Sequence, residues 1–312
     1  MRIEYHRTLI ADEVRNAAFE AALKSVIKPG ESIVADIGAG TGLLGLIAAK
    51  LGAREVHLYE MAEVAGVARE ILKANKARNC HLMPGHSTEM QNPPRADIVV
   101  SETLGNYAFE EDIIETLNDA VKRHLAPGGV VIPGKLAQYV APVTSDRFHI
   151  ELTAWDRVGR GLDLSFARTM SLNNIYVRTI KPADLLENGR SARRWDEIDF
   201  SVLNRTTRKG EARWKLNGAA TIHGFATWWV AELVPGVTLS TAPDAQRTHW
   251  EQLYFPLLRP IRCGVGESVA VSIRSKSSMR TGTDMAWTVT RQDRTGQARD
   301  RQSLDLGKGY LP

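Results

Sequence analysis

Apolar positions follow different patterns in the two parts of the chain. Up to about residue 134, short apolar runs alternate with segments in which apolar residues recur at helical spacing. A helix is predicted from about Ala11 to Lys28, where Pro29 and Gly30 end the pattern. Strands are predicted around residues 33–36, 56–59, 81–83, 98–100 and 130–133, with further helices at 43–51, 62–75 and 113–125. This alternation predicts a doubly wound parallel sheet.

Beyond about residue 135 the pattern changes to short alternating runs. They include Leu136–Ala141, Ala219–Phe225, Trp228–Leu233 and Ser268–Ile273, and all 7 tryptophans lie in this part. This pattern predicts an antiparallel β domain. Between Trp155 and Arg190 the alternation lapses, which predicts a helical insertion at about 156–190. We therefore expect two domains, residues 1–134 and residues 135–312.

Residues 97–112 combine a buried strand with a loop that carries an acid at each end. Glu102 follows the apolar run 98–100, and Glu111 lies across a bend that contains Gly105 and Asn106. Ligands of open α/β sheets bind at the carboxyl ends of strands, so two carboxylates there could grip a cationic or N–H-bearing substrate. Acids also favour the first turn of a helix, which by itself would explain residues 110–112. This stretch alone supports both interpretations.

A glycine-rich turn follows the first predicted strand. Gly38, Gly40 and Gly42 would let the backbone turn sharply and approach a ligand closely. Asp36 precedes the turn, and Glu60 ends the second strand 22 residues beyond Gly38. An acid there hydrogen-bonds the ribose of a dinucleotide or of S-adenosylmethionine (SAM). The GxGxG spacing differs from the dinucleotide pattern GxGxxG and therefore favours SAM.

Composition narrows the class of protein. The 312 residues are 43% hydrophobic and 24% charged, as is typical of soluble globular proteins. The sequence contains neither a membrane-length apolar run nor an N-terminal signal pattern, so we expect a cytoplasmic protein without a membrane segment. Cys80 and Cys263 lack metal-ligand spacing, which predicts no metal site. A net charge of +4 does not indicate a nucleic-acid partner and gives no general attraction for Arg-rich polypeptides.

Five stretches match motifs that occur in the same order in a known family. They are Val34–Leu44 for a SAM-binding motif, Leu58–Met61 for a ribose-binding strand end, Ser101–Glu111 for a double-E loop, Leu125–Pro133 for an exit into a barrel, and Thr248–Trp250 for a THW loop. Together they resemble the protein arginine methyltransferases over nearly the whole chain. The resemblance implies a Rossmann-like SAM-binding domain, an antiparallel β-barrel-like domain, and a helical arm that forms a homodimer.

The resemblance also implies roles for individual residues. The cofactor SAM would be bound by His6, Arg15, Asp36, Gly38, Gly40, Glu60, Ser87 and Thr88. Glu102 and Glu111 would bind the substrate, His249 would pair with Asp12, and Trp250 would line the wall of the pocket. Arg15 would face the methionine carboxylate of the cofactor, because guanidinium binds carboxylate in a bidentate fork. The alternatives are a solvated charge for Arg15, a structural histidine for His249 and a core side chain for Trp250.

Several positions depart from the family pattern. Thr103 and Asn106 replace the usual Trp and Tyr of the double-E loop, and Thr88 replaces the acid that usually meets the adenine. Leu9 and Ile113 replace two methionines of the arginine pocket, and we expect no counterpart of the family's YFxxY helix ahead of His6. These changes leave SAM binding intact and weaken the inference of an arginine substrate.

Three functions follow from these observations. The first is transfer of a methyl group to a guanidinium nitrogen of arginine in a protein, a peptide or a guanidino compound. The second is methylation of a small molecule on the same fold, as in indole C3-methyltransferases, with one glutamate accepting the indole N–H proton. The third is a non-catalytic SAM-binding or scaffold protein, which would have no need for the paired acids.

Overall fold

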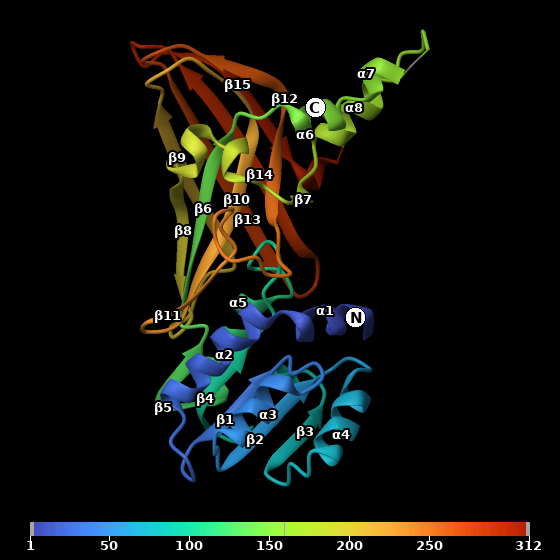
Figure 1. Ribbon diagram of the computed structural model, residues 1–312, viewed down its shortest axis with the longest axis vertical. Coiled ribbons are helices and arrows are strands. Elements are labelled where there is room, and N and C mark those ends of the chain that lie inside the picture. Colours follow the sequence, from blue (N-terminus) through green and yellow to red (C-terminus); the bar gives the residue numbers. More distant parts are fainter. Residues whose placement is uncertain (1–2, 159, 310–312) are drawn as a thin grey trace.

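The computed structural model describes residues 3–158 and 160–309, and it places a parallel-sheet part and an antiparallel part end to end (Figure 1). The predicted helix from Ala11 to Lys28 corresponds to α2 (Glu13–Val26), and a helix that the sequence did not predict, α1 (Ile3–Ala11), precedes it; both lie where the two parts meet. Asp12 separates them, and its Oδ1 accepts the Arg15 N–H at 2.9 Å. An aspartate that caps a helix in this way fixes its first residue, so α2 begins at Glu13.

The predicted parallel sheet is confirmed. Its strands are β1 (Ile33–Ile37), β2 (Glu55–Glu60), β3 (Cys80–Pro84), β4 (Ala96–Ser101) and β5 (Leu125–Ile132), in the order β3-β2-β1-β4-β5. The connecting helices are α3 (Leu43–Lys50), α4 (Ala65–Ala74), the short η1 (Ser87–Glu89) and α5 (Ile113–Arg123). The strand order reverses between β1 and β4, so the loops that follow these strands diverge and open a crevice. The glycine turn follows β1 and the acidic loop follows β4.

The last parallel strand begins earlier than the sequence predicts. The helix before it ends at Arg123, and β5 starts at Leu125 rather than near residue 130. Pro127 fits because β5 is an edge strand, where a missing N–H breaks no ladder, and the register of β4 and β5 shifts between Ala96 and Ile98.

The second part consists of two antiparallel sheets, as the alternating pattern predicts. One sheet joins β7 (Tyr176–Arg178), β12 (Gln252–Cys263), β10 (Ala220–Val234), β6 (Lys135–Val143) and β8 (Arg193–Asp199), with β11 (Val237–Ser240) paired to β10. The other joins β15 (Ala298–Asp305), β14 (Gly282–Gln292), β13 (Ser268–Ser278) and β9 (Thr207–Lys215). Two predicted runs, 219–225 and 228–233, fall largely within the single strand β10. Buried aromatic side chains such as Trp229 and Trp287 fill the space between the sheets.

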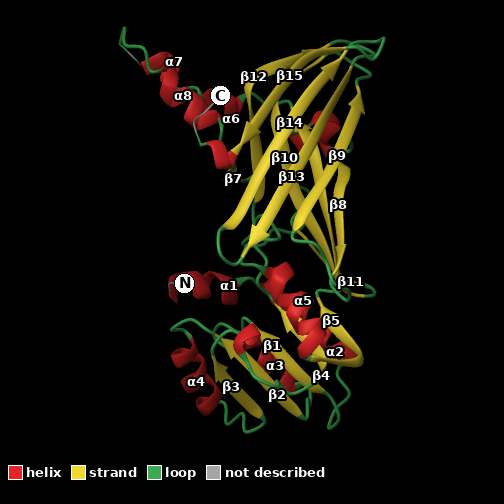
Figure 2. Cartoon of the chain, turned by 180° about the vertical axis from the view of Figure 1, so that it is seen from behind, coloured by secondary structure: helices red, strands yellow, loops and turns green. Residues whose placement is uncertain are grey.

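The predicted helical insertion projects from the barrel-like part (Figure 2). The helices begin before the predicted residue 156, with α6 (Arg147–Leu152), and continue outward with α7 (Trp155–Val158) and α8 (Ser165–Leu172). The short helices η2 (Pro182–Asp184) and η3 (Leu186–Gly189) lie beside β6 instead, and η4 (Leu306–Lys308) follows β15. Strand β7 ties the insertion to the start of β12. Within the described ranges, every helix is too short or too polar to cross a membrane.

Candidate active site

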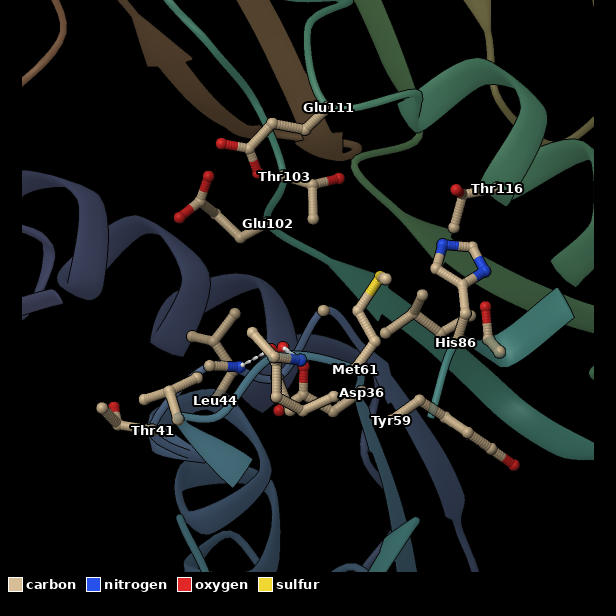
Figure 3. A pocket seen from close by; sticks show the side chains of 18 of the residues that line it. Asp36, Thr41, Leu44, Tyr59, Met61, His86, Glu102, Thr103, Glu111 and Thr116 are labelled. Carbon is tan, nitrogen blue, oxygen red and sulfur yellow. Dashed lines mark hydrogen bonds between the residues drawn. The ribbon is translucent and has the colours of Figure 1, made fainter. Parts of the chain in front are cut away.

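A cavity of about 470 Å³ opens at the carboxyl ends of the parallel strands. Its wall is built from the loops after β1, β2, β3 and β4, from one face of α1, and from the start of α5 (Figure 3). Met279, in the turn between β13 and β14, completes it from the barrel-like part. The predicted site residues on this wall are His6, Arg15, Asp36, Gly38, Gly40, Glu60, Ser87, Thr88, Glu102 and Glu111.

Two positions in the turn after β1 require glycine, because of their backbone angles and because neighbouring side chains lie close to them. Gly38 and Gly40 have φ angles of +72° and +55°, in the left-handed region that other residues rarely adopt. A Cβ at Gly38 would lie 2.5 Å from Thr103 Cγ2, and one at Gly40 would lie 3.3 Å from the His6 ring. The turn therefore leaves bare backbone against the cavity, which is the surface that a close-fitting nucleoside ligand needs.

Two carboxylates hold the turn in place. Glu60 Oε2 accepts the Gly40 N–H at 2.8 Å, and its Oε1 accepts the Ala62 N–H at 2.7 Å. Asp36 is buried, and its Oδ2 accepts the Gly45 N–H of α3 at 2.8 Å. Burial raises the pKa of Asp36 to about 7, because the charged form is poorly solvated there. The Glu60 oxygens keep lone pairs, so this carboxylate can still accept the hydroxyl groups of a ribose.

Two unpaired polar atoms on the cavity wall are available to a ligand. Ser87 Oγ and His6 Nε2 are buried and have no hydrogen-bond partner among the described residues. His86 and Thr116 lie together on the side away from Glu102 and Glu111 (Figure 3). Buried polar groups normally have partners, so the two unpaired atoms mark positions that a bound group would satisfy. The cradle of bare backbone, the fixed Glu60 and these atoms fit a SAM molecule.

The two acids of the double-E loop meet at the opposite end. Glu102 follows β4, and the carboxylates of Glu102 and Glu111 point into the same space (Figure 3). Arg15 forms an ion pair with Glu102, and its Nε donates to Oε2 at 2.5 Å. Burial raises the pKa of Glu102 to about 7 against the lowering effect of Arg15. Burial, and then the negative charge of Glu60, also raises the pKa of Glu111.

Of the neighbouring acids, Asp112 lies at the start of α5, as the helix-start interpretation predicts, and Glu110 does not. Asp112 precedes α5 with a left-handed φ of +58°, but its side chain makes no capping hydrogen bond and lines the cavity. The Glu110 side chain folds back over Gly105, and the backbone N–H groups of Tyr107 and Asn106 oppose the rise that burial causes in its pKa. Glu110 therefore stabilises the loop rather than the helix.

The predicted pair of His249 and Asp12 lies behind the cavity wall. Asp12 Oδ2 is 2.7 Å from His249 Nδ1 and accepts the His249 N–H at 2.8 Å. Trp250 is buried, and its Nε1 donates to the Leu104 carbonyl oxygen at 2.7 Å. Contrary to the prediction, Trp250 is not part of the cavity wall, because its ring packs against the His249 ring and meets Trp229 edge to face inside the protein.

Contacts from the barrel-like part fix the acidic loop on its far side. Trp229 Nε1 donates to the Gly105 carbonyl oxygen at 3.0 Å, and Ser277 Oγ donates to the Phe109 carbonyl oxygen at 2.9 Å. The Tyr107 hydroxyl lies 2.5 Å from Ser275 Oγ. The two acids are therefore positioned by strands far away in the sequence.

Sequence reasoning missed several residues of the cavity wall. Tyr5 and Ile10 lie on α1, which was not predicted, and Met61 and Met279 were not identified as site residues. Met61 directly follows Glu60, so its place could have been anticipated. The sequence contains no signal that would assign Met279 to the site.

Comparison with known proteins agrees with this geometry. Residues 135–292 match the family model described as "Arginine methyltransferase oligomerization subdomain", and residues 20–148 match "Ribosomal protein L11 methyltransferase (PrmA)". Protein arginine N-methyltransferase 6 of Xenopus tropicalis is 30% identical over 265 residues, which cover 80% of this chain and 77% of that protein. The chain belongs to the protein arginine methyltransferase family. Protein arginine N-methyltransferase 1 of Dictyostelium discoideum is also 30% identical, over 80% of this chain and 75% of its own.

Solved structures of the arginine methyltransferase family share the fold. The Trypanosoma brucei PRMT1 enzyme-prozyme heterotetrameric complex with AdoHcy gives a TM-score of 0.86 at 23% identity, with 97% of this chain and 98% of that chain covered. Arabidopsis thaliana protein arginine methyltransferase 10 gives a TM-score of 0.83 at 20% identity and covers 98% of each chain. The protein is a SAM-dependent methyltransferase with SAM as its cofactor.

Proposed function

We propose that this methyltransferase transfers the methyl group of SAM to a terminal guanidinium nitrogen of arginine in a protein, a peptide or a guanidino compound. One observation carries the proposal. Two carboxylates, Glu102 and Glu111, converge at one end of the cavity whose other end fits the cofactor. Two carboxylates that converge beside a cofactor site suit a planar cation with several N–H donors.

The two acids would make a protonated guanidinium reactive toward the methyl group. Bound SAM supplies an electrophilic methyl group on a sulfonium. A guanidinium has a pKa above about 12 and no free lone pair at neutral pH. Glu102 and Glu111 would accept its N–H groups, hold positive charge away from one terminal nitrogen, and take up the proton released on methylation. A carboxyl with a pKa of about 7, such as Glu102, is well matched to proton uptake near neutral pH.

Other residues would position these acids and the cofactor. Arg15, which already pairs with Glu102, would also face the methionine carboxylate, and Asp36, Gly38, Gly40 and Glu60 would hold the rest of the cofactor. The Asp12–His249 pair would tether the start of α2 to the barrel-like part. Because Trp250 contacts Leu104 rather than the cavity, we assign it to loop positioning.

A labelled-methyl assay tests the proposal. The enzyme is incubated with methyl-labelled SAM and arginine peptides, and Glu102→Gln is compared with Glu20→Gln on the exposed face of α2. We expect labelled arginine with the wild type and with Glu20→Gln, and a loss of at least about a hundredfold in Glu102→Gln. Intact SAM binding without transfer to any arginine peptide would overturn the proposal.

The same labelled-methyl assay, run with indole acceptors in place of the arginine peptides, tests the small-molecule alternative. Thr103 is small, and its methyl group packs toward Gly38, so the loop leaves room for an acceptor of another shape. An indole acceptor needs only one acid to accept its N–H proton, with C3 attacking the methyl group. Label on the carbon of a tryptophan or tryptamine derivative would support this alternative, and inactivity on every nucleophile would favour a scaffold role.

We further propose that the domain boundary lies near residue 134, between β5 and β6, and that the protein forms a homodimer through the insertion at 156–190. The match to an oligomerization subdomain supports the dimer. A cytoplasmic location remains a prediction from the sequence.

A further inference from the structure

The outer face of the sheet β15-β14-β13-β9 is basic. Resting on the proposed function, we propose that this face docks an acidic segment of the acceptor protein and so holds the acceptor while its arginine reaches the cavity. The docked segment is an extended polypeptide rich in carboxylates, and it lies apart from the arginine that is methylated.

The two faces of this sheet differ in chemistry because successive residues of a strand point to opposite sides. On the inner face, side chains such as Val271, Ile273 and Trp287 are buried in the core. The outer face carries small, polar and charged side chains. Its charged residues are Lys209, Glu211, Arg213 and Lys215 of β9, Arg274 and Lys276 of β13, Asp284 of β14, and Arg301 and Asp305 of β15. Cations therefore outnumber acids by two to one on this face.

Most of these cations have no acidic partner. Arg213 forms an ion pair with Glu211 at 3.2 Å, and Arg274 lies 3.8 Å from Asp305. Within the described part of the chain, no ion pair involves four exposed cations, which are Lys209, Lys215, Lys276 and Arg301. Asp284 lies on the strand beside Lys276 and is likewise without an ion pair there. The unpaired charge of the face is therefore strongly positive and available to an anionic ligand.

The register of the strands brings like charges together. Lys209 lies directly opposite Arg274 on the neighbouring strand, and Lys276 follows Arg274 two residues later on the same face. Like charges directly opposite in a sheet are destabilising, whereas opposite charges in these positions are stabilising. Carboxylates of a bound segment would relieve this repulsion. Ser272, which lies beside the basic residues on β13, adds a hydroxyl group that can hydrogen-bond the segment.

The basic face extends toward the cavity. Strand β13 ends at Ser278, and Met279, which directly follows it, lines the cavity. Lys276 is therefore about 10 Å from the cavity wall along the strand, and Lys215 lies near the far end of the sheet. Acids on the wall, such as Glu111, would repel a carboxylate. The acidic segment must therefore be separated from the arginine by a spacer of about five residues or more.

The face fits a polypeptide better than a nucleic acid. Sheets that bind single-stranded nucleic acid stack the bases on exposed aromatic side chains. The aromatic residues of these four strands, Trp214 and Trp287, are instead buried on the inner face. An acidic polypeptide requires only the charges and hydroxyl groups that the outer face presents.

Peptides with different tails test the docking. Each peptide carries one arginine, a neutral spacer of about ten residues, and a tail rich in glutamate, serine or lysine, and each is assayed for kcat and KM with saturating SAM. We expect KM to be about tenfold lower for the glutamate tail than for the serine tail, with an unchanged kcat, and the difference to disappear in about 0.5 M salt. Equal KM values, or a preference for the lysine tail, would overturn the inference and leave the proposed function standing.

Variants locate the docking surface. One variant combines Lys209→Gln, Lys215→Gln, Lys276→Gln and Arg301→Gln, and it should bring the ratio of KM between the serine and glutamate tails toward one. The matched control combines Lys24→Gln, Lys28→Gln, Lys50→Gln and Lys73→Gln, which are also exposed but lie on the parallel-sheet part. The control removes the same charge and should keep the ratio. An equal loss in both variants would show that overall charge, rather than this face, attracts the tail.

A binding measurement distinguishes failure of this inference from failure of the proposed function. A fluorescent glutamate-rich peptide without arginine and a single-stranded RNA of similar charge are titrated separately into protein saturated with S-adenosylhomocysteine. We expect the peptide to bind more tightly than the RNA and to lose its binding in the variant with the outer-face changes. If no arginine peptide is methylated, the proposed function fails, and this titration still decides whether the face binds an acidic polypeptide. Tighter binding of the RNA would overturn the choice of a polypeptide.

Discussion

At the scale of single residues, burial has the largest effect on the chemistry of the site. Glu102 and Asp36 are both buried at the edge of the parallel sheet, and desolvation raises the pKa of each to about 7. Arg15 lowers both values, so the guanidinium keeps a useful fraction of each carboxyl ionised at neutral pH. The proposed proton acceptor therefore titrates near neutral pH rather than near pH 4.

Activity should follow the ionisation of Glu102. Its carboxyl must be charged to grip the acceptor, so kcat/KM for the acceptor should rise with pH through a midpoint near 7. The measurement is a pH series from about 5.5 to 9 at saturating SAM. Because Asp36 titrates in the same range, Asp36→Asn is the control and should keep the rising limb. A flat profile would contradict the assignment of Glu102.

Asp36 should make stability depend on pH. Its folded pKa of about 7 lies above the ordinary 3.8, so ionisation disfavours the folded state at high pH and has no effect once pH falls below the ordinary value. Relative to wild type, Asp36→Asn should gain about 2.5 kcal/mol of unfolding free energy between pH 5 and pH 8. Urea denaturation without cofactor at the two pH values measures this change. A constant difference would show that Asp36 does not titrate as proposed.

At the scale of elements, the acidic loop receives its shape from the antiparallel part. Trp250 and Trp229 donate to consecutive carbonyl groups of the loop, at Leu104 and Gly105. The cofactor cradle, in contrast, is held mainly within the parallel part, by Glu60 and Asp36. Acceptor binding and cofactor binding should therefore respond differently to changes in the barrel-like part.

Removal of one loop contact should affect catalysis selectively. Trp250→Phe keeps an aromatic ring but leaves the Leu104 carbonyl without its donor, which costs about 1 to 3 kcal/mol and loosens Glu102 two residues away. We expect kcat/KM to fall by about tenfold with an unchanged Kd for SAM.

The matched control is Trp195→Phe. Trp195 is also buried, but its Nε1 has no partner within the part of the chain that the structure describes. This variant should keep full activity. If both variants lose activity equally, packing rather than the hydrogen bond to Leu104 explains the effect.

At the scale of the whole molecule, the insertion leaves apolar side chains uncovered. Leu162 is 72% exposed, Met170 is 49% exposed, and Trp155 is 39% exposed, all on the projecting helices and their connection. Apolar groups gathered on a projection indicate a surface that another protein covers. The match to an oligomerization subdomain favours a second copy of this chain.

Charges on this surface should separate the proposed dimer. Light scattering at micromolar concentration should give twice the chain mass for the wild type and the chain mass for Leu162→Glu with Met170→Glu. The control pair Val202→Glu and Leu203→Glu lies between β8 and β9, where each residue is 55% exposed, and it should leave the mass unchanged. A monomeric wild type would overturn the dimer.

Much of the fold could be read from local signals. The switch from helical spacing to two-residue alternation near residue 135 separated the parallel sheet from the antiparallel sheets, because each period reports which faces of an element are buried. The predicted ends of helices and strands were less accurate where a residue far away in the sequence determines where the element begins. Leu125 joins β5 because it pairs with Ala96, and Asp12 divides α1 from α2 as an N-cap that also binds His249.

For the site, the sequence by itself determined which chemical groups are available. Gly38, Gly40, Glu60 and Glu102 follow or end strands, and parallel strands bring such ends to one edge, while Glu111 lies later in the loop that Glu102 begins. Only the tertiary structure decided how these groups are used. It paired Arg15 with Glu102, turned Glu110 back over Gly105, placed Trp250 behind the cavity wall and brought Met279 into that wall. Most of these contacts join residues far apart along the chain, so they depend on how the two parts pack and leave no periodic trace in the sequence.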